Sequence, residues 1–390
     1  MDCRGYGSPY GDWSNGDTVD GIWDWYSIGA AMPIDIFATA HYAKAAENVA
    51  KMALIVNNTS AAQEYAGLAR NIKAAFLENF VDESGKILNA TGEGHTQSCY
   101  ALALDFDLLI KTNGSGVPVD ENEAVFPGTS TSTGVVDTAS EEIAFGHLIE
   151  RLAKTGYRMN TGFRASPSLM DQLVECGSPE VAYKVLLNEG APSWMNMVVK
   201  GSDTIWETMD AYVPGRETGT LGAQKHDRLN VFHGFGTIGE WLYRNIGGIN
   251  PDTDPANAGF KHFIIRPQIG GDLTCADVSY DSVRGTIRSH WWIEEVQGPN
   301  ILHLDIDVPA NTTATVYVPG EDLVKVLVAS SGVPSVSDSP ACVSEGITSY
   351  EVFEGQEDIF AFTVESGSYH FYSLSQRLFP DGCTSLCCEQ

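Results

Sequence analysis

A tryptophan and a glutamate stand side by side in the stretch Asp203-Thr204-Ile205-Trp206-Glu207-Thr208-Met209-Asp210. The face of an aromatic ring can hold the apolar side of a pyranose, and a carboxylate can accept a proton from a water or a sugar hydroxyl. The pair therefore indicates a pocket that binds and cleaves a sugar. The competing interpretation is a packed tryptophan beside a surface or helix-capping carboxylate, the usual environment of a glutamate.

The charge of the chain limits its partners. Its 390 residues include 23 basic and 51 acidic side chains, which give a formal net charge of −28. Such a field repels nucleic acid and anionic membrane surfaces, and no uninterrupted apolar run reaches membrane-spanning length. We therefore expect a neutral ligand as the partner, which fits the carbohydrate suggested by the tryptophan–glutamate pair, with no nucleic acid and no membrane. The eight cysteines lack the paired two-residue spacing of a zinc site, so no metal and no cofactor is expected.

Several features indicate the compartment. Four stretches satisfy the glycosylation acceptor pattern, and they begin at Asn57, Asn89, Asn113 and Asn311. The first residues do not contain the charged and apolar segments of a signal peptide. The prediction is a secreted or extracellular protein whose true amino terminus lies upstream of Met1. The scattered cysteines allow a disulfide or two, with buried free thiols as the alternative.

Helical patterns dominate the first two-thirds of the chain. A capping box at Ser60-Ala61-Ala62-Gln63 precedes apolar residues at helical spacing, and a similar stripe runs from Tyr42 to Val56. Thr138-Ala139-Ser140-Glu141 opens another helix. Ser166-Pro167 to Gly177 and Ser178-Pro179 to Gly190 each place serine at the cap, proline in the first turn and glycine past the end. Successive helices with short connections predict antiparallel hairpins in a helical toroid or array.

The period changes to two near residue 260. His262 to Pro267 is strand-like, and Leu302, Leu304, Ile306 and Val308 alternate with polar residues. Further short strands are expected at 314–318, 323–329, 359–364 and 369–374, which fits an antiparallel β-sandwich. The breaker-rich segment 247–259 is interpreted as a linker. The predicted divisions are a helical domain at 1–255, a sandwich at 256–376 and a cysteine-containing tail at 377–390.

Loops at one rim of a helical toroid converge on its axis, so polar and aromatic residues of several loops can form one pocket. The candidate substrate-binding residues in these loops are Asp12, Trp13, Trp194, Trp206 and His233, with Glu207 as the catalytic candidate. Each has an alternative role. Asp12 could cap the helix after its loop, the tryptophans could be core residues, and His233 could be a structural histidine.

An ordered series of motifs resembles the α-L-rhamnosidases of glycoside hydrolase family 78. The motifs are Gly11-Asp12-Trp13, Asn160-Thr161-Gly162-Phe163, Pro192-Ser193-Trp194, Thr204-Ile205-Trp206-Glu207 and Gly236-Thr237-Ile238-Gly239-Glu240-Trp241-Leu242-Tyr243, followed by Gly248-Ile249, Gly259-Phe260-Lys261 and Ile265-Arg266-Pro267. Each motif alone is weak, whereas the series over residues 7 to about 318 is specific. The resemblance implies an (α/α)6 six-hairpin toroid, incomplete at its amino-terminal end, followed by a carboxy-terminal β-sandwich.

The resemblance also implies a reaction, the hydrolysis of terminal non-reducing α-L-rhamnose with inversion. Inversion requires two carboxyl groups roughly 6.5 to 9.5 Å apart, one as general acid and the other as general base. Glu207 matches the base of the family, and the matching acid lies before the Gly-Asp-Trp motif, upstream of this chain. His233 departs from the family pattern, because relatives carry adjacent asparagine and histidine and here Asn230 is separated from it. Another (α/α)6 glycosidase, glucosidase or trehalase-like, and an inactive sugar-binding remnant remain alternatives.

Overall fold

The structure is a computed structural model of the 390-residue chain. It describes residues 11–12, 32–109, 138–206, 209, 234–296, 300–320, 322–328, 339–352 and 358–374. Contacts within the chain define two compact units, Met1–Ile238 and Gly239–Gln390. Each unit is considered by itself.

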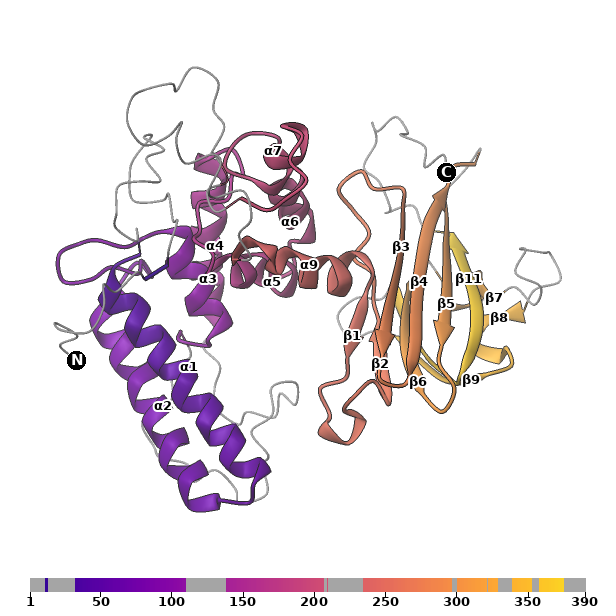
Figure 1. The fold of residues 1–390 in the computed structure, drawn as a ribbon, viewed down its shortest axis with the longest axis horizontal. Coiled ribbons are helices and arrows are strands. Elements are labelled where there is room, and N and C mark those ends of the chain that lie inside the picture. The colour runs from indigo at the N-terminus through magenta and orange to yellow at the C-terminus, as the bar shows by residue number, and fades with distance from the viewer. Residues whose placement is uncertain are drawn as a thin grey trace. The chain divides into compact units, whose positions relative to one another are not determined.

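The regular elements of the first unit are helices among its described residues, apart from two isolated antiparallel β-bridges, Val81 with Ile87 and Leu88 with Gly94 (Figure 1). Its elements are α1 (Ile34–Ile55), α2 (Thr59–Phe80), α3 (Gln97–Asp105), α4 (Thr138–Lys154), α5 (Ser166–Glu175), α6 (Pro179–Leu186), α7 (Trp194–Val199) and the 3-10 turn η1 (Gly234–Thr237). The short helix α9 (Ile238–Trp241) and the π-helical turn η2 (Leu242–Ile246) follow along the chain.

The helices α1 and α2 form an antiparallel hairpin, joined by a short turn (Figure 1). The face that α1 buries is almost entirely alanine, and it consists of Ile36, Ala40, Ala43, Ala46, Ala50 and Ala53. Small side chains let two helix backbones approach closely, so alanine can form the seam of a tight pair. The stripe that the sequence suggested, with Tyr42, Met52 and Val56, lies instead on the exposed face of α1. That interpretation was wrong because larger apolar residues were given more weight than alanine.

The other helix boundaries follow local signals closely. α4 begins at Thr138 and α6 begins at Pro179 with Ser178 as its N-cap, as predicted. α5 begins at Ser166 with Pro167 in its first turn, so its N-cap is Ala165 and the prediction of Ser166 as the cap was wrong. The predicted capping box at the start of α2 was wrong in detail: the N-cap is Asn58, whose side-chain oxygen accepts from the N–H of Ala61 at 3.2 Å.

The second unit contains two β-sheets. Their strands are β1 (Ile249–Pro251), β2 (His262–Ile265), β3 (Cys275–Ser282), β4 (Gly285–Glu294), β5 (Ile301–Val308), β6 (Thr313–Pro319), β7 (Val326–Val328), β8 (Ser339–Pro340), β9 (Ile347–Val352), β10 (Ile359–Val364) and β11 (Gly367–Leu374). One sheet has the order β1-β2-β6-β10-β9 and the other β3-β4-β5-β11-β7-β8. All described pairings are antiparallel except β2 with β6.

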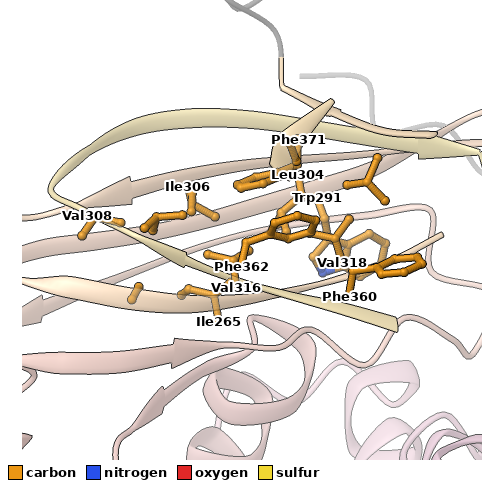
Figure 2. Close-up of a cluster of buried hydrophobic side chains, with 14 of the residues drawn as sticks. Ile265, Trp291, Leu304, Ile306, Val308, Val316, Val318, Phe360, Phe362 and Phe371 are labelled. Carbon is orange, nitrogen blue, oxygen red and sulfur yellow. The ribbon is translucent and has the colours of Figure 1, made fainter. Parts of the chain in front are cut away.

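The core of the sandwich lies between these sheets. Figure 2 shows Trp291, Leu304 and Phe371 of one sheet meeting Val316 and Phe362 of the other. The alternation predicted for residues 302–308 is confirmed, since Leu302, Leu304, Ile306 and Val308 are all buried. β1 and the 3-10 turn η3 (Pro255–Asn257) lie within the segment interpreted as a linker, and β1 pairs with β2.

An aromatic and polar cluster occupies the other face of the sheet β3-β4-β5-β11. His303 belongs to the polar set of β5, yet only 3% of it is exposed. The ring of Trp292 stacks on His303 with centroids 4.6 Å apart and planes 3° apart, and His290 stacks on Trp292 at 4.8 Å. Because its rings stack against one another, this face buries polar side chains as well as apolar ones.

Three further findings bear on the sequence predictions. Cys275 is disulfide-bonded, whereas Cys99, Cys176 and Cys342 are not part of a disulfide. Among the described residues, no helix is both long and apolar enough to cross a membrane. The same part of the chain contains no group of three or more potential metal ligands.

Candidate active site

Asp12 is fully buried and uses both carboxylate oxygens as acceptors. Oδ2 accepts from the hydroxyl of Ser98 at 2.5 Å and from the N–H of Gly162 at 2.8 Å. Oδ1 accepts from the N–H groups of Arg164 at 3.1 Å and Ala165 at 3.0 Å. Arg164 and Ala165 directly precede α5, and Ala165 is its N-cap, where a backbone donor lacks a partner within the helix. Asp12 therefore holds the loop that enters α5, and its role in substrate binding stays a prediction.

The loop at residues 160–165 is fixed by further polar contacts. The N–H of Asn160 donates to Oε1 of Gln97 at 2.9 Å, and Nε2 of Gln97 donates to the carbonyl of Arg158 at 3.1 Å. The hydroxyl of Ser166 donates to the carbonyl of Gly162 at 2.6 Å. The first turn of α3, which supplies Gln97 and Ser98, thus holds the same loop as Asp12.

Trp194 begins α7 and is buried, with 5% of its surface exposed. Its indole N–H donates to the carbonyl of Phe235 in η1 at 3.0 Å. The helix is capped by Ser193, whose hydroxyl accepts from the N–H of Asn196 at 3.0 Å. The indole nitrogen of Trp194 therefore connects two loops that the sequence assigned to one pocket.

Trp206 is nearly as buried, with 9% of its surface exposed. Its backbone N–H donates to the thioether sulfur of Met197 at 3.3 Å. Three residues later, the carbonyl of the fully buried Met209 accepts from Nδ2 of Asn196 at 2.9 Å. Trp206 and Met209, the described residues on either side of 207–208, are thus both hydrogen-bonded to α7.

The structure links the three described candidates through a chain of contacts. Asp12 binds the start of α5, α5 packs against η1, and η1 accepts the hydrogen bond from Trp194. α7 then holds the stretch that contains Trp206. Trp13, Glu207 and His233 lie outside the described residues, so their predicted roles stay predictions. The described part of this region is a buried, hydrogen-bonded frame around the loops that carry the motifs.

Sequence reasoning missed Gln97, Ser98 and Asn196, three polar residues of this frame. A signal for the first two exists in the composition of α3. The residues Cys99 to Leu104 are all weakly polar or apolar, and every residue from Gln97 to Leu104 is buried. A helix that is buried all around must pair its polar side chains. For Asn196, no local pattern indicates a role, because its partner Met209 lies thirteen residues away.

A second polar cluster lies beside α3. Nδ1 of His95 contacts the hydroxyl of Tyr100, and the ring of His147 stacks on Tyr100 with centroids 5.5 Å apart. Burial, followed by the charge of Arg151, lowers the pKa of His95 to about 4, and burial raises the pKa of Tyr100. At neutral pH both side chains are uncharged, which suits a packing contact between α3 and α4 better than proton transfer.

The chain matches two family models in succession. Residues 4–246 match the bacterial alpha-L-rhamnosidase 6 hairpin glycosidase domain, and residues 248–331 match the bacterial alpha-L-rhamnosidase C-terminal domain. The predicted fold, a six-hairpin helical domain followed by an antiparallel sheet domain, is therefore confirmed.

Individual relatives agree with these models. An alpha-L-rhamnosidase of Streptomyces avermitilis is 30% identical over 305 residues, 78% of this chain and 25% of that protein. An alpha-L-rhamnosidase of Formosa agariphila is 30% identical over 287 residues, 74% of this chain and 26% of that protein. The chain thus spans about a quarter of the length of these relatives.

Solved structures show the same fold. The crystal structure of Streptomyces avermitilis alpha-L-rhamnosidase complexed with L-rhamnose matches with a TM-score of 0.68 and 27% identity, over 93% of this chain and 28% of that one. The alpha-L-rhamnosidase of Aspergillus terreus matches with a TM-score of 0.65 and 21% identity, over 93% of this chain and 33% of that one.

Proposed function

Because the chain belongs to the bacterial α-L-rhamnosidase family, we propose that it takes part in the hydrolysis of terminal non-reducing α-L-rhamnose from glycosides or oligosaccharides. The observation that carries the proposal is the succession of both family domains over residues 4–331. The buried frame of α3, α5 and α7 supports it, since a pocket needs loops that are held in place.

We further propose that the reaction inverts the anomeric centre with Glu207 as general base. In an inverting glycosidase, a carboxylate removes a proton from the water that attacks the anomeric carbon, while a second carboxyl group protonates the leaving oxygen. The family resemblance supports Glu207 as the general base. The same resemblance places the general acid before the Gly-Asp-Trp motif, so we assign no general acid to a residue of this chain.

The activity is tested with two chromogenic substrates, an aryl α-L-rhamnoside and an aryl α-D-glucoside. We expect turnover of the aryl α-L-rhamnoside and no turnover of the aryl α-D-glucoside. An NMR time course of the hydrolysis should show β-L-rhamnose as the initial product. Preference for the glucoside would instead favour another (α/α)6 glycosidase. First appearance of α-L-rhamnose would contradict inversion.

The role of Glu207 is tested by Glu207→Gln in a protein that also contains the segment expected to supply the general acid, because inverting hydrolysis uses both groups. Loss of an activating base should lower kcat roughly 10²–10⁴-fold while the thermal unfolding temperature stays unchanged. Glu180→Gln, at an exposed position of α6, is the matched control and should keep full activity. A Glu207→Gln enzyme with normal kcat would remove Glu207 from the mechanism.

One alternative is an inactive sugar-binding remnant, which would bind rhamnose without cleaving it. Calorimetry with L-rhamnose distinguishes the two cases. A binding remnant gives a binding isotherm for both the unaltered chain and Glu207→Gln, with turnover absent from both.

We also propose that the protein is secreted. The disulfide at Cys275 supports this, because structural disulfides persist in oxidising compartments. The acceptor asparagines Asn57, Asn58 and Asn311 are exposed, so they are accessible to glycosylation. Mass spectrometry of peptides from the secreted protein, before and after amidase release of glycans, should show modification at one or more of them. Fully unmodified peptides at all acceptor positions would count against this proposal.

A further inference from the structure

The helix α7 makes three contacts with two other stretches of the candidate site, residues 203–210 and the loop that contains Phe235. Trp194 donates to Phe235, Asn196 donates to Met209 and Met197 accepts from Trp206. Asn196 and Met197 are consecutive, and 3% and 2% of their surfaces are exposed. One turn of helix therefore fixes backbone atoms on both sides of residues 207–208.

α7 is itself held by contacts that do not involve this stretch. Its N-cap Ser193 accepts from the N–H of Asn196, and the hydroxyl of Ser193 donates to the carbonyl of Asn188. At the other end, the N–H of Lys200 donates to the carbonyl of Asn196 at 3.1 Å. Asn196 thus projects from a capped helix, which limits the positions its amide can take.

The chemistry of the two contacts requires these side chains. A buried carbonyl needs a donor, and the neutral Nδ2 of asparagine supplies one without adding a charge. Aspartate at the same position has no donor and would bring a negative oxygen against the carbonyl of Met209. A thioether is a weak acceptor that can lie in an apolar site, and leucine in its place would fill the space without accepting.

We infer that Asn196 is a positioning residue for Glu207, because its amide fixes the backbone at Met209 while the neighbouring Met197 fixes it at Trp206. This inference rests on the proposed role of Glu207 as general base. Catalysis is sensitive to small displacements of a reacting group, so a base needs a backbone held on both sides. Asn196 acts through the backbone and has no contact with the substrate in this assignment.

The first test is hydrogen–deuterium exchange of the peptide spanning residues 203–209 in the full chain. Asn196→Asp should accelerate its exchange roughly tenfold, since a lost buried hydrogen bond raises the population of locally open states. Asn79→Asp is the matched control, because Nδ2 of Asn79 donates to the carbonyl of Ala75 at 2.8 Å on the exposed side of α2. Unchanged exchange in Asn196→Asp, or a peptide already unprotected in the unaltered chain, would overturn the inference.

A second variant covers the case in which Asn196→Asp does not fold. Met197→Leu conserves volume and removes only the acceptor, so it should fold and accelerate exchange of the Trp206 amide. Met159→Leu, at another fully buried methionine, is its control. Equal exchange in the two methionine variants would overturn the assignment.

Turnover of an aryl α-L-rhamnoside supplies the functional readout. Asn196→Asp should lower kcat at least tenfold with KM nearly unchanged, whereas a purely structural role would lower the unfolding temperature and leave kcat per folded molecule intact. If Glu207→Gln also has full activity, the proposed function of Glu207 fails. The exchange measurement then still decides whether Asn196 holds the stretch, so the two failures are distinguishable.

Discussion

Nδ1 of His303 lies 3.2 Å from Nε2 of His370, and each ring turns its other nitrogen toward a carboxylate. Nε2 of His303 lies 2.9 Å from Oε2 of Glu294, and Nδ1 of His370 contacts Oδ1 of Asp305. Each of these three contacts needs one hydrogen, whereas two neutral imidazoles carry only two. The pair therefore satisfies all three contacts when it holds a single additional proton. A further proton would place two N–H groups face to face.

This arrangement predicts a pH dependence of stability in the sandwich. Burial lowers the pKa of His303 below 6.5, a positive His370 lowers it further, and Glu294 and Asp305 act in the opposite direction. The folded pair can take a second additional proton only by placing two N–H groups face to face, whereas both rings are accessible to protons in the unfolded chain. The unfolded chain therefore binds more protons than the folded chain on acidification. The contribution of His303 to stability is complete above about pH 6.5 and is lost as the pH falls.

Urea unfolding at about pH 7.5 and about pH 5.5 measures this contribution. The free energy of unfolding should fall less between these conditions in His303→Gln than in the unaltered chain. Other ionisable groups face the pair, namely His290, Glu294 and Arg288 on β4, Asp277 on β3, Asp305 and Asp307 on β5 and Tyr372 on β11. They are present in both proteins, so the difference isolates His303. His262→Gln, outside this cluster, is the control, and an identical pH dependence in all three proteins would contradict the prediction.

Asp12→Asn should destabilise the helical unit by about 3 kcal/mol, because a carboxylate that accepts four hydrogen bonds would be replaced by an amide with one acceptor oxygen. The new NH2 group would face backbone donors at the start of α5. Asp82→Asn is the control, since Asp82 also accepts several hydrogen bonds but is exposed. Thermal unfolding by circular dichroism compares the two, and equal losses would show that burial of Asp12 is unimportant.

The alanine seam of α1 predicts opposite outcomes for two neighbouring substitutions. Ala43→Leu should cost about 1–3 kcal/mol, because Ala43 is fully buried against a closely packed partner helix. Ala45→Leu, on the exposed side, should change stability by less than about 0.5 kcal/mol. Both variants replace alanine by leucine within α1, so the change in helix propensity is the same in both and cancels when their stabilities are compared. A tolerated leucine at residue 43 would mean that α1 and α2 are not in close contact.

Local signals predicted much of the fold. Proline in the first turn located the starts of α5 and α6, and Ser178 is the predicted N-cap of α6, since these signals depend on residues next to one another. The strands β3, β4 and β9 were not predicted, and neither were the short strands β1 and β8. β3 and β9 lie at sheet edges, where their residues are exposed or only partly buried. In β4, His290 and Trp292 point outward while Ser289 and Trp291 point inward, so polar and aromatic residues occur on both faces and hide its period.

The frame of the candidate site depends on partners that are distant in sequence. Asp12 was identified as a pocket candidate, but its partners Ser98 and Gly162 lie 86 and 150 residues away. Asn196 belongs to no recognised motif, and only the fold brings its amide to Met209. The sequence could indicate which loops carry chemistry, whereas the residues that hold those loops follow from tertiary contacts alone.

Two glycines of the recognised motifs have the same backbone conformation and different surroundings. Gly248 has φ +73°, and a Cβ there would lie 2.2 Å from the nitrogen of Pro267 and 2.5 Å from the carbonyl carbon of Arg266. Gly259 has φ +71°, but its Cβ would meet only Val283 Cγ2 at 3.3 Å. Gly259→Ala should therefore cost about 1 kcal/mol, from the left-handed conformation alone.

Gly248→Ala should cost about 3 kcal/mol or more, because backbone atoms cannot move aside as a flexible side chain does. The carbonyl of Gly248 accepts from the N–H of Arg266 at 2.8 Å, so any shift that relieves the overlap also weakens this contact beside β2. Urea unfolding monitored by tryptophan fluorescence gives both values. Equal destabilisation of the two variants would mean that the chain relaxes around residue 248, and the close approach to Pro267 would then not explain the glycine.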